Sequence, residues 1–338
     1  MTRPLERTAQ VIKMVGRREF IAILATAAAS RAMAQTTVPR PLVAVLEGTS
    51  AEVAPYYLRP FEQTLREHGH VNGQTIDFVH KFADGDASRY PALAEELIRL
   101  TPAVLVTGST TGALACKRLT ATIPIVSANL TDPIGLGLIS TLARPGGNVT
   151  GVVISLEGLP GKLLQILREV VPEARRIGLL ANPSERANAR QRQAAEQVAA
   201  GLGMTFITVP VRTRDDIASA FEEFLRARVE AIYAPSSLML RAERQYFAER
   251  ALAARLPTMC NAREIVEAGA LMSYGTDLRE NYRRAAHFVD RILKGRRPAD
   301  LPTENPTRFV LSINLRTATA LGLTIPTTLL AGADEVIE

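Results

Sequence analysis

Short apolar runs alternate with amphipathic helical patterns along this chain, and the alternation restricts the possible folds more than any other feature. Five runs are largely apolar, as strands buried on both faces of a sheet are. They are residues 42–46, 103–106, 123–126, 177–180 and 231–233. Between them, residues 90–98 and 217–225 place apolar side chains along one helical face. This pattern predicts α/β architecture, with parallel sheets covered by helices.

The strand candidates form two series. The first runs from about residue 40 to 152 and the second from about 158 to 270, with the glycine- and proline-rich residues 144–148 between them. A chain of 338 residues that is 47% hydrophobic can bury two cores. We therefore predict two doubly wound parallel-sheet lobes. Cys116 and Cys260 lie in different series, so we expect two separate buried thiols.

The net charge of +6 is concentrated at the N-terminus. Residues 1–34 contain six Lys/Arg and two Asp/Glu, so four of the six net charges lie there. The remaining chain is nearly balanced, and the whole sequence has no tryptophan and 5% aromatic residues. Binders of nucleic acid need a basic surface with aromatic side chains, so we expect no nucleic-acid partner.

Residues 1–34 have the order of an export signal. A basic head that includes Arg17 and Arg18 precedes the apolar residues 20–29, and Ala32 and Ala34 suit a signal peptidase. The paired arginines resemble a twin-arginine signal. We predict cleavage after Ala34 and a periplasmic product, with Met1 or Met14 as the start. The alternative is an amphipathic helix packed on the body of the protein.

Ligands of doubly wound sheets bind beyond the carboxyl ends of the strands, so the residues after each apolar run are the candidate site. These are mostly small or polar. The ligand-binding candidates are Glu47, Gly48, Thr49, Gly108, Ser109, Thr110, Thr111, Asn129, Asp132, Asn182, Ser184, Ser236, Ser237 and Tyr274. No catalytic or metal-ligating residue is predicted. Two such rims that face each other would form a cleft.

Each candidate group has a structural alternative. Residues 108–112 separate a strand from a helix, so their amides and hydroxyls could bind a carboxylate or simply cap the helix. Asp132 could accept from a ligand amine or cap a helix that starts at Pro133. Glu47 is either a partner for a cationic ligand group or a solvated rim carboxylate.

The second-lobe candidates also have both a ligand-binding and a structural interpretation. Asn182 and Ser184, together with Asn188, offer amide and hydroxyl groups to a ligand or cap the helix that follows. Tyr274 stacks on a ligand or fills the hinge between the lobes.

Several stretches together resemble one family. They are residues 144–151 (RPGGNVTG), 271–275 (LMSYG), 292–295 (ILKG), 298–302 (PADLP) and 313–318 (INLRTA). Their order and spacing resemble the periplasmic substrate-binding proteins of ABC importers, in the tryptophan- or aromatic-amino-acid-binding branch.

The resemblance implies a type I binding protein whose chain crosses between the lobes three times. The crossings would lie near residues 150–155, 273–276 and 303–309. The N-terminal lobe would then comprise residues 35–152 and 277–302, and the C-terminal lobe residues 153–276 and 303–338. It also implies that the helix over residues 282–293 packs on the first lobe.

The resemblance implies a monomeric solute-binding component that captures a carboxylate or amino-acid-like molecule and delivers it to an ABC permease at the inner membrane. Ser236 and Ser237 depart from the acidic residue and asparagine that the amino-acid-binding members usually have, which points to a carboxylate without an amine. The alternatives are a periplasmic sensor subunit or an exported enzyme. The chain has no nucleotide-, nucleophile- or zinc-binding motif, so we expect no catalysis, cofactor or metal.

Overall fold

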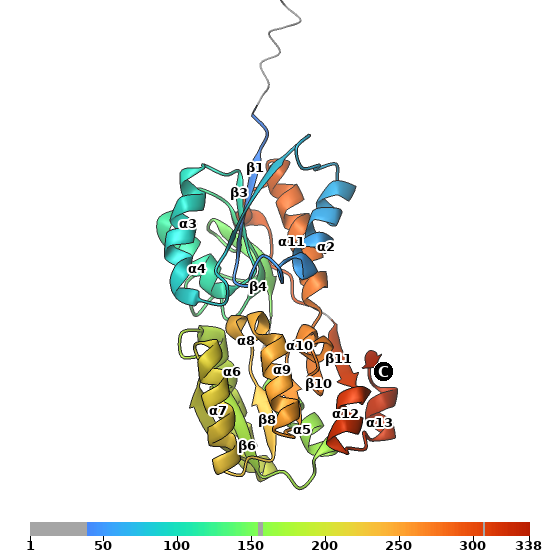
Figure 1. The fold of residues 1–338 in the computed structure, drawn as a ribbon. Helices are drawn as coiled ribbons and strands as arrows, with labels where there is room; N and C mark the ends of the chain where they lie inside the picture. Colours follow the sequence, from blue (N-terminus) through green and yellow to red (C-terminus); the bar gives the residue numbers. More distant parts are fainter. Residues whose placement is uncertain (1–38, 155–157, 307) are drawn as a thin grey trace, which may run out of the picture. The chain divides into compact units, whose positions relative to one another are not determined.

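The computed structural model describes residues 39–154, 158–306 and 308–338. The predicted export signal at residues 1–34 lies outside these residues. Residues Pro41–Glu338 form one contiguous unit by their contacts, and this unit contains two separate sheets (Figure 1). The prediction of two α/β lobes is therefore confirmed.

The first sheet has five parallel strands in the order β2-β1-β3-β4-β5. These strands are β1 (Leu42–Glu47), β2 (Asp77–Phe82), β3 (Val104–Thr107), β4 (Ile125–Leu130) and β5 (Val149–Val153). Helices α3 (Tyr90–Arg99) and α4 (Thr110–Leu119) cover one face, and α2 (Pro55–Glu67) and α11 (Leu278–Leu293) cover the other (Figure 1). The three apolar runs of the first series thus became β1, β3 and β4.

The second sheet has seven strands in the order β12-β11-β10-β9-β8-β6-β7. They are β6 (Arg176–Ala181), β7 (Thr205–Pro210), β8 (Ala231–Ala234), β9 (Thr258–Cys260), β10 (Met272–Thr276), β11 (Phe309–Asn314) and β12 (Glu335–Ile337). The sheet is parallel except where β11 runs antiparallel to β10. This exception arises because the chain leaves the sheet after β10, passes through α11 in the first lobe, and returns in the opposite direction.

Helices cover both faces of the second sheet as well. One core cluster packs under α5 (Leu159–Val170), α6 (Arg186–Ala199), α12 (Leu315–Leu321) and α13 (Thr327–Ala331). The other packs under α7 (Arg214–Arg226), α8 (Leu238–Ala242), α9 (Arg244–Ala253) and α10 (Arg263–Glu267). Short 3₁₀ turns complete the connections: η1 (Ala87–Arg89), η2 (Ala200–Leu202) and η3 (Pro298–Asp300).

The chain passes between the sheets after β5, after β10 and before β11. At the first of these passages Val152 forms a β-bridge with Glu304, and the Thr150 hydroxyl donates to the Leu301 carbonyl at 2.9 Å. Gly151 has a φ of +138°, and a Cβ there would lie 2.0 Å from the Ser127 carbonyl oxygen. Only glycine therefore fits at this point of the connection.

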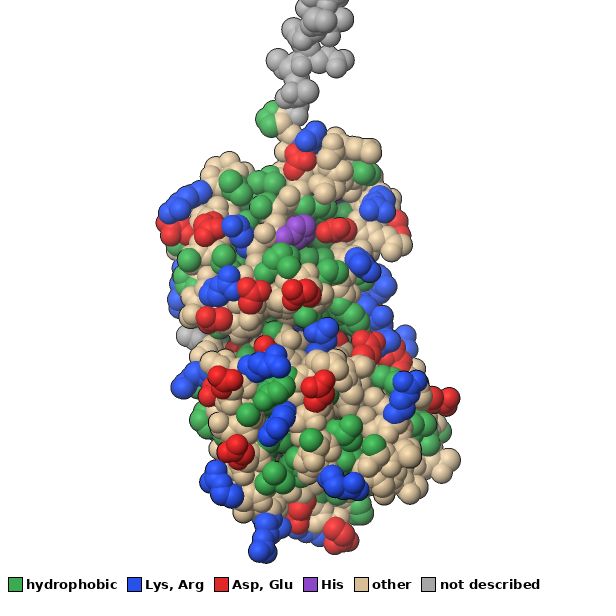
Figure 2. Space-filling view, viewed as in Figure 1, with side chains coloured by type: hydrophobic (Ala, Val, Ile, Leu, Met, Phe, Trp, Pro, Cys, Tyr) green, Lys and Arg blue, Asp and Glu red, His purple; other side chains and the backbone are tan. Residues whose placement is uncertain are grey.

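Within the described residues, no helix is long and apolar enough to cross a membrane. Cys116 and Cys260 are both free and buried, as predicted. On the face shown in Figure 2, acidic and basic side chains are interspersed.

Candidate ligand-binding cleft

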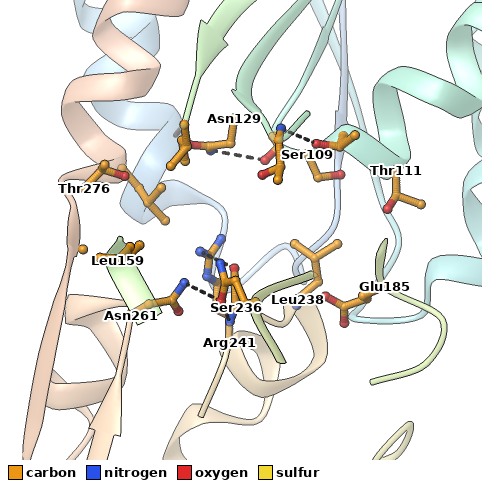
Figure 3. A pocket seen from close by; sticks show the side chains of 17 residues that line it. Ser109, Thr111, Asn129, Leu159, Glu185, Ser236, Leu238, Arg241, Asn261 and Thr276 are labelled. Carbon is orange, nitrogen blue, oxygen red and sulfur yellow. Dashed lines mark hydrogen bonds between the residues drawn. The ribbon is translucent and has the colours of Figure 1, made fainter. Parts of the chain in front are cut away.

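A cleft opens between the carboxyl ends of the first-sheet strands and the facing loops and helices of the second lobe (Figure 3). About 690 Å³ lies between its walls, counting the part that is open to solvent. Its walls are formed by Gly108, Ser109, Thr110, Thr111, Asn129, Thr131, Ile154, Leu159, Glu185, Gln191, Ser236, Leu238, Arg241, Asn261, Gly275, Thr276 and Leu278. Six of the predicted residues are among them.

The N-terminus of α4 forms one part of the first-lobe wall. Ser109 is its N-cap, since its hydroxyl accepts from the Gly112 amide at 3.1 Å and contacts the Tyr90 hydroxyl at 2.9 Å. The Thr110 hydroxyl accepts from the Thr131 amide at 2.8 Å. The capping alternative is thus present, yet the amides of Thr110 and Thr111 have no acceptor among the described residues. The positive end of the helix can therefore still attract an anion.

Asn129 fixes the part of this wall that adjoins the hinge. Its amide nitrogen donates to the Gly108 carbonyl at 3.2 Å, and its oxygen accepts from Asn281 Nδ2 at 2.8 Å. Asn281 begins the second turn of α11 and also donates to the Thr276 hydroxyl at 3.3 Å. Because these amides hold one another, Asn129 has a fixed orientation at the cleft.

Glu185 brings a carboxylate to the second-lobe wall, but its oxygens are already occupied. They accept from Asn182 Nδ2, from the Ser237 hydroxyl and from the Leu238 amide, each at 2.8 Å. Burial raises the pKa of Glu185, and these hydrogen bonds oppose that rise. Glu185 and Ser237 together cap α8, so this carboxylate stabilises the helix that carries Leu238 and Arg241 into the cleft.

Three predicted second-lobe residues thus lie behind the wall. Asn182 and Ser237 hold Glu185, and Ser184 donates its amide to Asn182 Oδ1 at 3.0 Å. Asn188 accepts from the Asn182 amide at 2.9 Å. Any part that these residues play in ligand binding remains a prediction, and it would act through Glu185.

Arg241 is a cation in the wall that we did not single out from the sequence. Its side chain is 11% exposed, its Nε lies 3.3 Å from Glu264 Oε1, and its Nη2 donates to the Ser236 hydroxyl at 3.3 Å. Figure 3 shows its guanidinium extending from the second lobe towards the first. Tyr57 of the first lobe donates to the same Glu264 oxygen at 2.6 Å. Glu264 therefore joins the two lobes beside the cleft.

Gln191 and Asn261 complete the second-lobe wall. Gln191 Oε1 accepts from the Ser236 amide at 2.7 Å and from Asn261 Nδ2 at 3.4 Å. This arrangement leaves the Gln191 amide nitrogen and the Asn261 oxygen for a ligand. Asn261 directly follows β9, which has only three residues and gives no recognisable apolar run, and Gln191 lies within α6, so the pattern of the first-lobe rims finds neither.

Glu47 is not a solvated rim carboxylate. It is 2% exposed, and its Oε2 accepts from the Tyr282 hydroxyl at 2.7 Å. Burial raises its pKa to about 7. It lies directly behind Gly108, where a Cβ would come within 2.6 Å of Glu47 Oε2. The neighbouring candidates Gly48 and Thr49 also lie outside the cleft wall: Gly48 packs against Tyr90 and Leu238, and Thr49 is buried.

Asp132 and Tyr274 do not line the cleft. Asp132 Oδ2 lies 2.5 Å from Arg190 Nη2 of α6, and Oδ1 accepts from the Gly135 amide at 3.2 Å, so it caps a turn and pairs across the lobes. Tyr274 stacks on Phe309, with ring centroids 5.6 Å apart, inside the hinge strands. Among the residues with described coordinates, no group of three or more His, Cys, Asp or Glu is arranged to hold a metal ion.

Comparison with known proteins assigns the family. Residues 42–337 match the family described as "ABC transporter substrate binding protein". The chain belongs to this family. The match extends over both sheets and over every wall of the cleft, so the family assignment applies to the whole two-lobed unit.

Individual relatives agree with the family in fold. A structure from Streptococcus pneumoniae, an ABC domain in complex with L-Trp, is 26% identical, has a TM-score of 0.81, and covers 88% of this chain and 100% of its own. A conserved domain protein of Vibrio cholerae is 28% identical, with a TM-score of 0.81 and coverage of 88% and 99%. A "Tyrosine-binding protein" of Clostridioides difficile is 23% identical over 265 residues, which are 78% of this chain and 75% of the relative. The fold is that of type I periplasmic binding proteins.

Proposed function

We propose that this protein is the solute-binding component of an ABC importer. It captures a small carboxylate or amino-acid-like molecule between its lobes and delivers it to a permease at the inner membrane. The observation that carries the proposal is the cleft itself, which takes walls from both lobes and presents, at the N-terminus of α4, amides with no acceptor among the described residues. The relatives that are named for tryptophan and tyrosine support a ligand of this size and class.

The proposed cycle needs no bond-making. A ligand favours the closed state only if it contacts both lobes, because equal affinity for open and closed forms shifts nothing. The first lobe supplies Thr110, Thr111 and Asn129 for such contacts, and the second lobe supplies Ser236 and Arg241. Closure would bury the solute and bring together the surfaces of both lobes that a permease recognises.

The proposed location is the periplasm, where the protein would act as a monomer. Substrate-binding proteins of ABC transporters act outside the cytoplasmic membrane, and the sequence of residues 1–34 supports export with cleavage after Ala34. N-terminal sequencing of the exported protein tests the cleavage site.

A thermal-shift screen tests the proposed function. The full chain is heated with amino acids, their desamino acids, short carboxylates, amines and neutral sugars. A ligand at about a hundred times its dissociation constant adds about 2.7 kcal/mol to the free energy of unfolding. We expect a carboxylate or an amino acid to raise the melting temperature. A chain that responds to none of these solutes would contradict the proposal.

A further inference from the structure

The inference starts from hydrogen-bond donors that converge on the cleft. Arg241 keeps one nitrogen unused: its Nε lies 3.3 Å from Glu264 Oε1 and its Nη2 donates to Ser236, whereas its Nη1 has no acceptor among the described residues. Ser236, which accepts from Arg241, still has its own hydroxyl proton to donate. A planar guanidinium that is nearly buried matches the two oxygens of a carboxylate.

The opposite wall offers donors of the same kind. The amides of Thr110 and Thr111 lie at the positive end of a ten-residue helix, and both residues line the cleft. Figure 3 shows Ser109 and Thr111 on the first-lobe side, across from Ser236 and Arg241 on the second. Both lobes thus favour negative charge in the space between them.

The cleft wall offers no free carboxylate, among the described residues, to pair with a ligand ammonium group. Of the described lining residues, Glu185 is the one acid, and four donors already occupy its oxygens, the fourth being the Met239 amide at 3.4 Å. Glu264, behind the wall, is shared by Arg241 and Tyr57. Glu47 has an unpartnered Oε1 but lies behind Gly108, outside the lining. A ligand ammonium would therefore be desolvated near a buried guanidinium without direct contact to a free carboxylate in the wall.

The aliphatic part of the wall suits the rest of such a ligand. Leu159, Leu238 and Leu278 line the cleft from three different helices. They provide an apolar surface for the body of a molecule whose acidic end is bound elsewhere.

Building on the proposed function, we propose that this cleft selects carboxylic acids that lack an α-ammonium group, and that Arg241 is the cationic partner of the ligand's carboxylate. In this role Arg241 is a specificity-determining residue. Its contact with Glu264 orients the guanidinium, and Glu264 in turn holds Tyr57 of the other lobe.

Isothermal titration of the full chain with matched ligand pairs tests this selectivity. The pairs are leucine with 4-methylpentanoate, tyrosine with 3-(4-hydroxyphenyl)propionate, and tryptophan with 3-(indol-3-yl)propionate. In any pair that binds, we expect the desamino acid to bind at least as tightly as the amino acid. An amino acid that binds ten times more tightly than its desamino partner would overturn the inference.

Variants at Arg241 test the residue. Arg241→Met should weaken binding of the acid about ten- to a hundredfold, the range expected for loss of a hydrogen bond to a charged group. Arg241→Lys should recover part of the affinity because it keeps the charge. Arg226→Met is the matched control, since Arg226 is 70% exposed on α7 and pairs only with Glu223 among the described residues. Unchanged affinity in folded Arg241→Met protein would overturn the inference.

A double variant controls for destabilisation of the Arg241→Met protein. Arg241→Met leaves Glu264 without its cation, so the double variant Arg241→Met/Glu264→Gln removes both charges while the new amide oxygen can still accept from Tyr57. Glu264→Gln alone is the reference for the double variant, because these two proteins differ only in the presence of Arg241. Retained acid binding in the double variant would contradict the role of Arg241.

The outcomes separate the inference from the proposed function. If an amino acid, amine or sugar binds and no acid does, the inference fails while solute capture stands. If no solute of the panel binds, both fail. Preference for the desamino acid together with its loss in Arg241→Met supports both.

Discussion

At the scale of single residues, the cleft is shaped by close packing as much as by polar groups. Gly108 lies between the cleft and a buried pair, Glu47 and Tyr282, and a Cβ at Gly108 would lie 2.1 Å from the Tyr282 hydroxyl. The absence of a side chain at Gly108 is thus what lets the first-lobe wall close over a buried carboxyl group.

Gly108→Ala should therefore destabilise the protein and weaken ligand binding. Overpacking of this kind costs about 1–3 kcal/mol. Chemical denaturation gives the loss of stability, and titration with the acid gives the loss of affinity. Gly201→Ala is the control, because a Cβ there meets nothing within 4 Å. Equal stability of the two variants would show that Tyr282 and Glu47 can shift to accommodate a Cβ at Gly108 without measurable cost.

Glu47 should make stability depend on pH. Burial raises its pKa from 4.5 to about 7 in the folded protein, so the folded state binds more protons than the unfolded state between these values. Stability should then fall as the pH rises from about 4.5 to 7, by about 3 kcal/mol in total from this group. Glu47→Gln removes the titration.

Denaturation of both proteins between pH 4.5 and 8 measures this effect. The stability difference between wild type and Glu47→Gln should change in favour of the variant as the pH rises, because other titrating groups contribute equally to both proteins. A difference that stays constant over this range would show that folding does not raise the pKa of Glu47.

At the scale of elements, α8 is a short helix that depends on its cap. It has five residues, and its N-terminus is held by Ser237 and by Glu185 of the loop after β6. Since α8 carries Leu238 and Arg241 into the cleft, the position of the guanidinium depends on this cap.

Ser237→Ala should lower stability by about 1 kcal/mol through loss of the cap. It should also weaken binding of the acid, because Arg241 would lose its fixed position. Ser219→Ala is the matched control, as Ser219 is exposed on α7, where its hydroxyl donates only to the Asp215 carbonyl among the described residues. Denaturation and titration are run on both variants. Unaltered binding in Ser237→Ala would mean that α8 holds its position without the cap.

The sequence pattern predicted the central strands and missed parts that depend on tertiary structure. The apolar runs correspond to β1, β3, β4, β6 and β8. The strands β2 and β7 lie on the sheet edges and are only partly buried, so their composition gives no continuous apolar run. The reversed direction of β11 follows from the excursion of the chain through α11, which local patterns do not record.

The candidate site likewise contains residues that the sequence pattern predicted and residues that it missed. Residues after β3 and β4 were predicted because the carboxyl ends of parallel strands share one edge. Arg241 was missed because an arginine on a helix is usually solvated, and its burial arises only when α8 meets the first lobe. The sole local signal was the apolar segment before it, Leu238 to Leu240.

At the scale of the whole molecule, the lobes are joined by polar contacts as well as by the hinge. The bond from Tyr57 to Glu264 and the ion pair between Asp132 and Arg190 both connect the first lobe to the second. The first is buried and is expected to contribute more than the exposed pair.

Tyr57→Phe should shift the molecule towards an open form. Loss of a hydrogen bond to a carboxylate costs about 1.5–3 kcal/mol, which would raise the apparent dissociation constant of the ligand at least severalfold. Small-angle X-ray scattering should show a larger radius of gyration without ligand. Tyr246→Phe is the control, since no described group accepts from its hydroxyl. Identical scattering of Tyr57→Phe and wild type would exclude this contact as a latch.

The central claim is that the two lobes enclose a small molecule and release it unchanged. The most direct measurement is to extract the ligand that co-purifies with the full chain, identify it by mass spectrometry, and titrate it back onto ligand-free protein. We predict one molecule per chain, recovered chemically intact after prolonged incubation. Conversion of that molecule to a product, or the lack of any saturable binding, would contradict the account.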